Sequence, residues 1–180
     1  MNSFDIISEY YKPGSEAYAM FLQHGKSVAR KALDAAAKVP NLNPDITFIY
    51  EAAMLHDIAI FMTDAPELYC TGEHPYLCHG YLGRELLESK GLFKHAMVCE
   101  RHVGVGITAE EISHHNLPLP PRDMVPISIE EQIICFADKF FSKNGSSMET
   151  ETPVKEILVN LAQYGPDKAK TFESWVRLFS

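Results

Sequence analysis

The sequence predicts an all-α fold, a single-domain helical bundle, on three observations. Apolar residues recur at helical spacings of three and four along most of the chain, and the short β-branched stretches fall inside those periods. Two Ser/Thr-x-x-Glu patterns have the form of capping boxes, which open helices. The length of 180 residues, 46% of them hydrophobic, suits one domain with a sizeable core, whereas two domains would both be undersized. We therefore expect residues 1–180 to form one helical domain without strands.

Three helices are predicted in the first half of the chain. Residues 15–38 carry an apolar stripe, and the segment 40–44 ends this helix because each of its two prolines disfavours helix in the residue before it. A second helix over 45–57 is expected to use its first residue, an aspartate, as the N-cap. Residues 63–74 are expected to form a loop. A third helix over 75–89 begins with a proline, which the first turn of a helix tolerates.

Five further helices are predicted in the second half, over residues 92–103, 108–115, 128–141, 154–163 and 166–178. Two of them open with the capping boxes at Thr108 and Ser128. The proline-rich run 118–126 is expected to be an extended connection, and the polar segment 144–153 a loop. Trp175 and the phenylalanines beside it in the last helix are expected to be core or dimer contacts, so a homodimer is one expected assembly.

Charge and composition exclude several classes of partner. The net charge of −8 argues against a hold on nucleic acid polymers, which needs basic surface, but a small phosphorylated substrate stays compatible because bound metal ions can reverse the local potential. The four cysteines form no CxxC pair, which favours free thiols in a reducing cytoplasm over a disulfide framework. No signal-peptide pattern or membrane-length apolar run is visible, so we expect a cytoplasmic protein that does not bind membranes.

Six ionisable side chains lie on helix faces that should be apolar. His24, for example, has Met20 and Val28 four positions away on either side, the spacing at which residues share one face. The full set lies on five predicted helices and comprises His24, His56, Asp57, His79, His102 and Asp138. A lone histidine on such a face is more often a satisfied core residue than a ligand. Four histidines together with two carboxylates are far harder to explain in that way.

The two carboxylates of this set need a positive partner. An isolated buried carboxylate is destabilising unless it is paired or coordinates a cation. No Arg or Lys shares the apolar faces of Asp57 and Asp138, since Lys139 is expected to point elsewhere at one-residue spacing. A shared centre of divalent metal ions satisfies all six side chains at once. Imidazole and carboxylate ligands suit Mn, Fe, Ni, Zn or Co, with Mg an alternative if oxygen ligands dominate.

These residues, in this order along the chain, resemble the HD superfamily of metal-dependent phosphohydrolases. The resemblance covers roughly residues 23–143 and is carried by His24, by Leu55-His56-Asp57-Ile58, by His79 and His102, and by Asp138 in Phe136-Ala-Asp-Lys139. The order of ligands is similar to that of the dinuclear branch. The chain is also similar to small HDIG-type proteins of bacteria and archaea and, in ligand order, to the small HD enzymes that split diadenosine tetraphosphate.

The resemblance implies an HD-type helical domain with divalent metal ions, two in number, Fe or Mn being the first expectation. It implies that His24, His56, Asp57 and Asp138 hold one ion and that His79 and His102 hold the other, with Asp57 bridging. It also implies an enzyme that cleaves a phosphate ester or anhydride of a nucleotide-like small molecule, with His56 and Asp57 as catalytic residues. Two close cations lower the pKa of a bridging water, which gives hydroxide, and stabilise charge on the phosphoryl oxygens.

One position departs from the family pattern. Family members often read His-Asp-Ile-Gly-Lys, whereas this chain has Ile60 in place of the lysine, which is a frequent phosphate contact. Arg101, Lys139, Lys143 or His74 would have to bind the phosphate of the substrate instead. Two other functions stay open. One is a non-catalytic module that binds a nucleotide or other ligand, which the missing lysine favours, and the other is an oxygenase with a di-iron centre on the same ligands.

Overall fold

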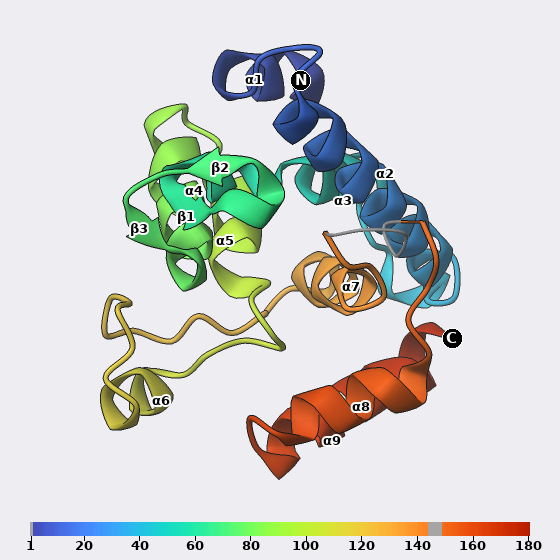
Figure 1. Ribbon diagram of the computed structural model, residues 1–180. Coiled ribbons are helices and arrows are strands. Elements are labelled where there is room, and N and C mark those ends of the chain that lie inside the picture. The colour runs from blue at the N-terminus through green and yellow to red at the C-terminus, as the bar shows by residue number, and fades with distance from the viewer. Residues whose placement is uncertain (1, 144–148) are drawn as a thin grey trace.

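The computed structural model describes residues 2–143 and 149–180. The chain is mainly helical, which confirms the predicted fold class (Figure 1). Its α-helices are α1 (Ser3–Tyr10), α2 (Glu16–Ala36), α3 (Ile46–Leu55), α4 (His79–Ser89), α5 (Phe93–Arg101), α6 (Ala109–His114), α7 (Ile129–Asp138), α8 (Val154–Ala162) and α9 (Pro166–Phe179). Short 3₁₀ turns, among them η2 (Ile58–Met62) and η4 (Tyr76–Cys78), connect some of these helices.

Four helices begin close to where the sequence predicts. The side-chain oxygens of Ser15, Asp45 and Ser128 accept backbone N–H groups in the first turns of α2, α3 and α7. Thr108 and Glu111 form the reciprocal capping box that opens α6. These side chains satisfy N–H groups that lack a partner within the helix, so the local sequence fixes where each helix starts.

Helix α1 is not predicted from the sequence. It begins after Asn2, whose side chain accepts the backbone N–H of Phe4 at 3.1 Å. Ile6 and Ile7 bury its inner face in the core, and α1 contacts α3 and η2. A helix of 8 residues is too short to show a clear apolar period, so tertiary packing decides its conformation.

The segment 63–74, predicted to be a loop, contains strands instead. β1 (Thr63–Ala65) lies between β2 (Cys70–Thr71) and β3 (His74–Pro75), and it pairs antiparallel with β2 and parallel with β3. The prediction of a chain without strands was therefore wrong in detail. Strands of two or three residues are too short for alternation of apolar and polar residues to be visible in the sequence.

Two predicted helix boundaries were also wrong. Pro75 ends β3 with extended backbone, and α4 begins only at His79, after η4. The helix predicted over 128–141 ends at Asp138, where the next residue caps it. The loop predicted over 144–153 lies partly outside the described residues, which resume at 149. The first two differences matter for function because both place a predicted ligand at a helix end.

The helices that carry the six side chains converge on one region. α2 packs against α3 and α7, α4 packs against α5, and α3 and α5 contact α7 as well as each other. Figure 1 shows α8 and α9 paired beside α7, whereas α6 lies on a long connection between α5 and α7. Among residues 2–143 and 149–180, no helix combines the length and apolar character needed to cross a bilayer.

The aromatic residues of α9 belong to the core. Phe172 stacks on Phe136 with ring centroids 5.4 Å apart, and Phe179 lies 5.3 Å from the same ring. Trp175 is also buried. Of the two roles expected for these aromatics, the structure shows the core role, and the homodimer stays a prediction.

Candidate metal centre

All six predicted ligand residues are buried, each at 5% exposure or less, and most of them sit at helix ends. His24 lies within α2, His56 caps the C-terminus of α3, and Asp57 follows it directly. The other three are His79 at the start of α4, His102 after the last turn of α5 and Asp138 at the end of α7. Neither carboxylate points into bulk solvent, so both need a partner inside the protein.

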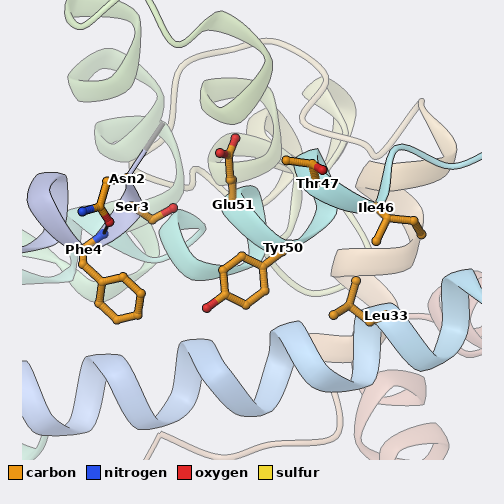
Figure 2. A pocket seen from close by; sticks show the side chains of 8 residues that line it. All are labelled: Asn2, Ser3, Phe4, Leu33, Ile46, Thr47, Tyr50 and Glu51. Carbon is orange, nitrogen blue, oxygen red and sulfur yellow. Dashed lines mark hydrogen bonds between the residues drawn. The ribbon is translucent and has the colours of Figure 1, made fainter.

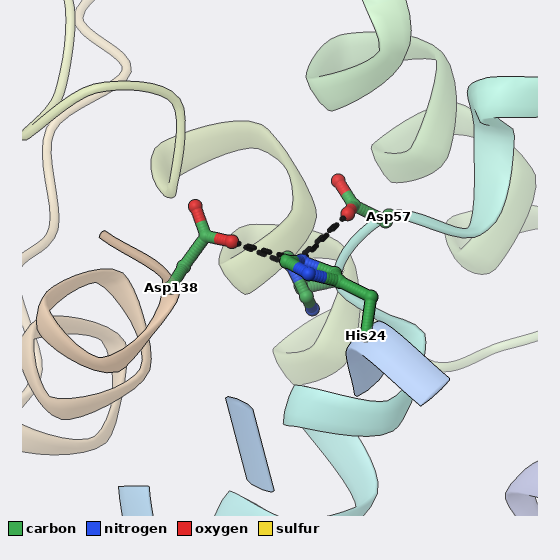
Figure 3. A group of neighbouring side chains, drawn as sticks. His24, Asp57 and Asp138 are labelled. Carbon is green, nitrogen blue, oxygen red and sulfur yellow. Dashed lines mark hydrogen bonds and ion pairs between the residues drawn. The ribbon is translucent and has the colours of Figure 1, made fainter. Parts of the chain in front are cut away.

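Four of these side chains form what we call the first ligand group: His24, His56, Asp57 and Asp138. The Nε2 atom of His24 lies 3.0 Å from Oδ1 of Asp138 and 3.3 Å from Oδ2 of Asp57 (Figure 3). The Nε2 atom of His56 lies 3.2 Å and 3.3 Å from the same oxygens of Asp57 and Asp138. One ligand atom from each residue lies within 4.8 Å of all the others, a spacing that one metal ion can bridge.

The second ligand group consists of Asp57, His79 and His102. The Oδ1 atom of Asp57 lies 3.4 Å from Nε2 of His79 and 3.2 Å from Nε2 of His102. The two imidazole Nε2 atoms are 3.1 Å apart. Asp57 thus presents Oδ2 to the first group and Oδ1 to the second, which is the arrangement of a carboxylate that can bridge two cations.

Backbone carbonyls fix the orientation of three of the imidazoles. The Nδ1 atoms of His56, His79 and His102 lie 2.6–2.7 Å from the carbonyl oxygen three residues earlier. A carbonyl only accepts hydrogen bonds, so Nδ1 carries a hydrogen in each ring, and in the neutral form of the ring Nε2 keeps its lone pair. In this tautomer His79 and His102 cannot hydrogen-bond to each other through Nε2. Two lone pairs at 3.1 Å need a shared cation or proton between or beside them.

Burial and charge shift the pKa values of the two groups differently. Burial lowers the pKa of His79 to about 3 and also lowers that of His102, so both rings are neutral ligands at neutral pH. Burial also acts to lower the pKa of His56, but the carboxylates of Asp57 and Asp138 raise it to about 9. The pKa values of both carboxyls are well below their usual range, because nearby cationic groups outweigh burial. The first group therefore attracts positive charge.

The residues present fit divalent metal ions. Nε2 of His56 and Oδ1 of Asp57 are buried without a hydrogen-bond partner among the described residues, and Oδ2 of Asp57 makes ion-pair contacts only. Buried polar atoms without a regular hydrogen bond are rare, and here three of them face the same region. A set of four imidazoles and two carboxylates suits Mn, Fe, Ni, Zn or Co. His24, His56, Asp57 and Asp138 could hold one ion, and Asp57, His79 and His102 another.

Two lysines lie next to the carboxylates, although no Arg or Lys was expected to serve them from their own helix faces. Lys139 Nζ lies 2.8 Å from Oδ2 of Asp138, and Lys143 Nζ lies 3.0 Å from Oδ2 of Asp57. The expectation that Lys139 points away was wrong because its side chain is long enough to reach Oδ2 of Asp138, although its backbone keeps the helical conformation. Both lysines line a cavity of about 370 Å³ beside the first ligand group.

That cavity adjoins the first ligand group through Asp138. Its lining comprises Glu67, Leu68, Tyr76, Asp138, Lys139, Phe141, Ser142 and Lys143. Its volume is at the lower end of the range for small-molecule sites. Sequence reasoning missed Glu67, Tyr76 and Ser142. Only the position of Tyr76, three residues before a ligand histidine, offered a signal, since its carbonyl was available to that imidazole.

The other predicted phosphate contacts lie elsewhere. Arg101, at the end of α5, donates from Nη1 to both carboxylate oxygens of Glu131 at 3.0 Å. His74 lies in β3, in register with Thr63 of β1. Neither Arg101 nor His74 lines the cavity beside the first ligand group. Ile60, where relatives of the resembled family often carry lysine, is buried in the core.

A second hollow, of about 350 Å³, lies between α1, α2 and α3 (Figure 2). It is lined by Asn2, Ser3, Phe4, Leu33, Ile46, Thr47, Tyr50 and Glu51. None of the side chains predicted to bind metal or phosphate belongs to this lining, so it gives no argument for the chemistry of the site.

Comparison with known proteins adds an independent line of evidence. The HD domain profile matches residues 21–142, which is most of the chain. An uncharacterized protein of Methanocaldococcus jannaschii is 34% identical over 120 residues, which cover 65% of this chain and 63% of that protein. Two proteins named tRNA (cytidine(56)-2'-O)-methyltransferase are each 32% identical to this chain, the one from Thermoplasma volcanium over 133 residues and the one from Picrophilus torridus over 124 residues.

The matches to the methyltransferases cover 73% and 68% of this chain but only 34% and 32% of those proteins. The chain therefore spans less than two thirds of the length of each of these relatives. No solved structure matches the chain. The matched profile covers all six side chains of the two ligand groups, from His24 to Asp138.

Proposed function

Because the chain belongs to the HD domain family, we propose that it is a metal-dependent phosphohydrolase acting on a phosphate ester or anhydride of a nucleotide-like small molecule. The observation that carries the proposal is the pair of ligand groups joined through Asp57, beside a cavity lined by two lysines. Fe and Mn are the first candidates for the metal, with Ni, Zn, Co and Mg as alternatives.

Different residues of the chain would bind the metal ions and the substrate in such a reaction. Divalent cations held by the two groups would supply the positive charge that acidifies a water molecule and neutralises the phosphoryl oxygens. Asp57 would contact both groups and so fix the distance between them. The imidazoles whose Nδ1–H donates to a backbone carbonyl would keep their Nε2 atoms directed at the centre. Lys139 and Lys143 would bind the phosphate of the substrate in the cavity. They would take over the role of the family lysine, because this chain has Ile60 at that position.

The names of two relatives do not support methyl transfer by this chain. The match covers about a third of each methyltransferase, so the named activity can belong to the remaining two thirds of those proteins. The net charge of −8 also argues against a hold on a nucleic acid polymer. A small phosphorylated molecule is the substrate class that the cavity and its lysines support.

The experiment combines metal analysis with a substrate panel. Protein purified without added metal is analysed for its metal content, then supplied with Mn²⁺ or Fe²⁺ and assayed for phosphate or nucleoside release across a broad panel of phosphoesters. We expect metal-dependent release from the wild-type chain and none from Asp57→Ala, because that change removes a ligand from both groups. Asp34→Ala, a change of the same type at an exposed position of α2, is the matched control and should keep full activity.

Other outcomes would redirect the assignment. A metal-replete protein that binds nucleotide tightly without turning it over would indicate a sensor or binding module. Oxygen consumption by the iron-loaded protein, with a paramagnetic signal from half-reduced iron, would indicate an oxygenase on the same ligands. No release of phosphate or nucleoside from any member of the phosphoester panel would refute the phosphohydrolase proposal.

A further inference from the structure

Tyr76 is placed between the second ligand group and the cavity. It lies in η4, directly before α4, and its position three residues before His79 is its only signal in the sequence. Its backbone carbonyl and ring face His79, whereas its side chain also lines the cavity that holds Lys139 and Lys143. One residue thus touches both the metal ligands and the space available to a substrate.

The carbonyl and the ring of Tyr76 orient His79. The Nδ1–H group of His79 donates to the carbonyl oxygen of Tyr76 at 2.6 Å. The two rings also lie against each other, with centroids 4.6 Å apart and planes inclined by 32°. His79 is therefore held from one nitrogen and along one ring face, which directs its Nε2 atom toward Asp57 and His102.

The hydroxyl of Tyr76 lies on the side of Lys143 instead, and both residues line the cavity. It interacts with the side chain of Lys143, whose ammonium also lies 3.0 Å from Oδ2 of Asp57. The ammonium has three hydrogens to donate and lies 3.8 Å from Oδ1 of Asp138, beyond hydrogen-bond distance, so its contacts with Asp57 and Tyr76 leave one hydrogen for a ligand. A phenol that accepts from Lys143 keeps its own hydrogen, which can be donated to an oxygen atom in the cavity. Phosphoryl oxygens are the acceptors that a lysine and a phenol can bind together.

We propose that Tyr76 serves this site in two ways: its ring and carbonyl position His79 in the second ligand group, and its hydroxyl binds phosphoryl oxygens together with Lys143. The second role rests on the proposed function, since it requires a phosphorylated ligand in the cavity. The first role does not, because it concerns only metal binding.

The experiment titrates the full-length chain with Mn²⁺ and then with inorganic phosphate, using calorimetry. Tyr76→Phe removes only the hydroxyl, so we expect phosphate affinity to fall about tenfold while Mn²⁺ affinities change by less than about twofold. Tyr76→Leu also removes the ring, so we expect the weaker Mn²⁺ equivalent to lose about tenfold or more in affinity. Tyr50→Phe, at a half-exposed tyrosine on α3, is the control and should change neither affinity.

Wild-type phosphate affinity in Tyr76→Phe would overturn the hydroxyl role, and wild-type Mn²⁺ binding in Tyr76→Leu would overturn the positioning role. If the leucine variant unfolds in thermal denaturation, Tyr76→Met supplies a longer, flexible side chain that also lacks the ring for the same titration. A wild-type chain that binds Mn²⁺ but no phosphate would overturn the hydroxyl role together with the proposed function. In that case the Mn²⁺ titration of Tyr76→Leu would still decide whether Tyr76 positions His79.

Discussion

The two ligand groups share Asp57 but differ in charge and in the way the fold builds them. The first group brings together side chains from α2, α3 and α7, contains a second carboxylate, and has Lys139 and Lys143 beside it. The second group adds only two neutral imidazoles, from α4 and α5, to the shared carboxylate. The first group is thus held by charge as well as packing, whereas the second depends on how closely two helices approach.

Glycines allow that close approach of α4 and α5. A Cβ atom at Gly80, the residue after His79, would lie 2.9 Å from the carbonyl oxygen of Cys99, and one at Gly83 would lie 3.1 Å from Cβ of Cys99. The same Cys99 carbonyl accepts the Nδ1–H of His102. The helix contact that brings the two imidazoles together therefore has little room for any side chain at these positions.

A matched pair of ligand deletions should separate the groups most strongly. His24→Ala leaves three donors in the first group, whereas His102→Ala leaves only two in the second. We expect His102→Ala to lose one metal equivalent outright, with an affinity loss of at least about 100-fold, and His24→Ala to lose less. Elemental analysis and calorimetry with Mn²⁺ measure both. Equal losses in the two variants would show that charge in the first group does not compensate for a missing imidazole.

A smaller effect is expected from Gly80→Ala. The added methyl group would push α4 away from the backbone of α5, at a cost of about 1–3 kcal/mol in the free energy of unfolding. Mn²⁺ binding to the second group should weaken, while binding to the first should persist. The control is Gly25→Ala, next to His24 in α2, where a Cβ would make ordinary contact with Met54 at 3.5 Å. Denaturant unfolding and Mn²⁺ titration measure both effects. Equal losses of stability and of Mn²⁺ affinity in Gly80→Ala and Gly25→Ala would contradict the proposed difference between the two groups.

The smallest effect is expected at Tyr11, which supports the turn after the shared carboxylate. Its hydroxyl donates to the carbonyl of Ile58 and accepts the N–H of Phe61, each at 3.2 Å, and its ring is buried. Tyr11→Phe should cost about 1 kcal/mol in the free energy of unfolding, because it leaves two backbone groups without that partner. Since Asp57 serves both groups, any weakening of Mn²⁺ binding should affect both equally. A change of Mn²⁺ affinity in only one group would show that Tyr11 does not act through Asp57.

Local signals in the sequence predicted most of the helices and the members of both ligand groups. Ser15, Asp45, Thr108 and Ser128 cap helices through contacts within one turn, which depend only on neighbouring residues. Polar residues such as Asp138 stood out because a helical stripe of apolar neighbours predicts burial at their positions. Burial of an acid then requires a positive partner, whatever the rest of the fold.

Tertiary structure alone decided which other side chains reach the site. The sequence favours Arg101 as the first candidate for binding phosphate, ahead of Lys143, yet Arg101 pairs with Glu131 and Lys143 lies at Asp57. Tyr76 gave no signal by type, and its carbonyl and hydroxyl acquire their roles only where η4 meets α4 and the end of α7. Periodicity determines which face of a helix is buried. It does not determine which distant residue lies opposite, because that depends on how helices far apart in the sequence cross.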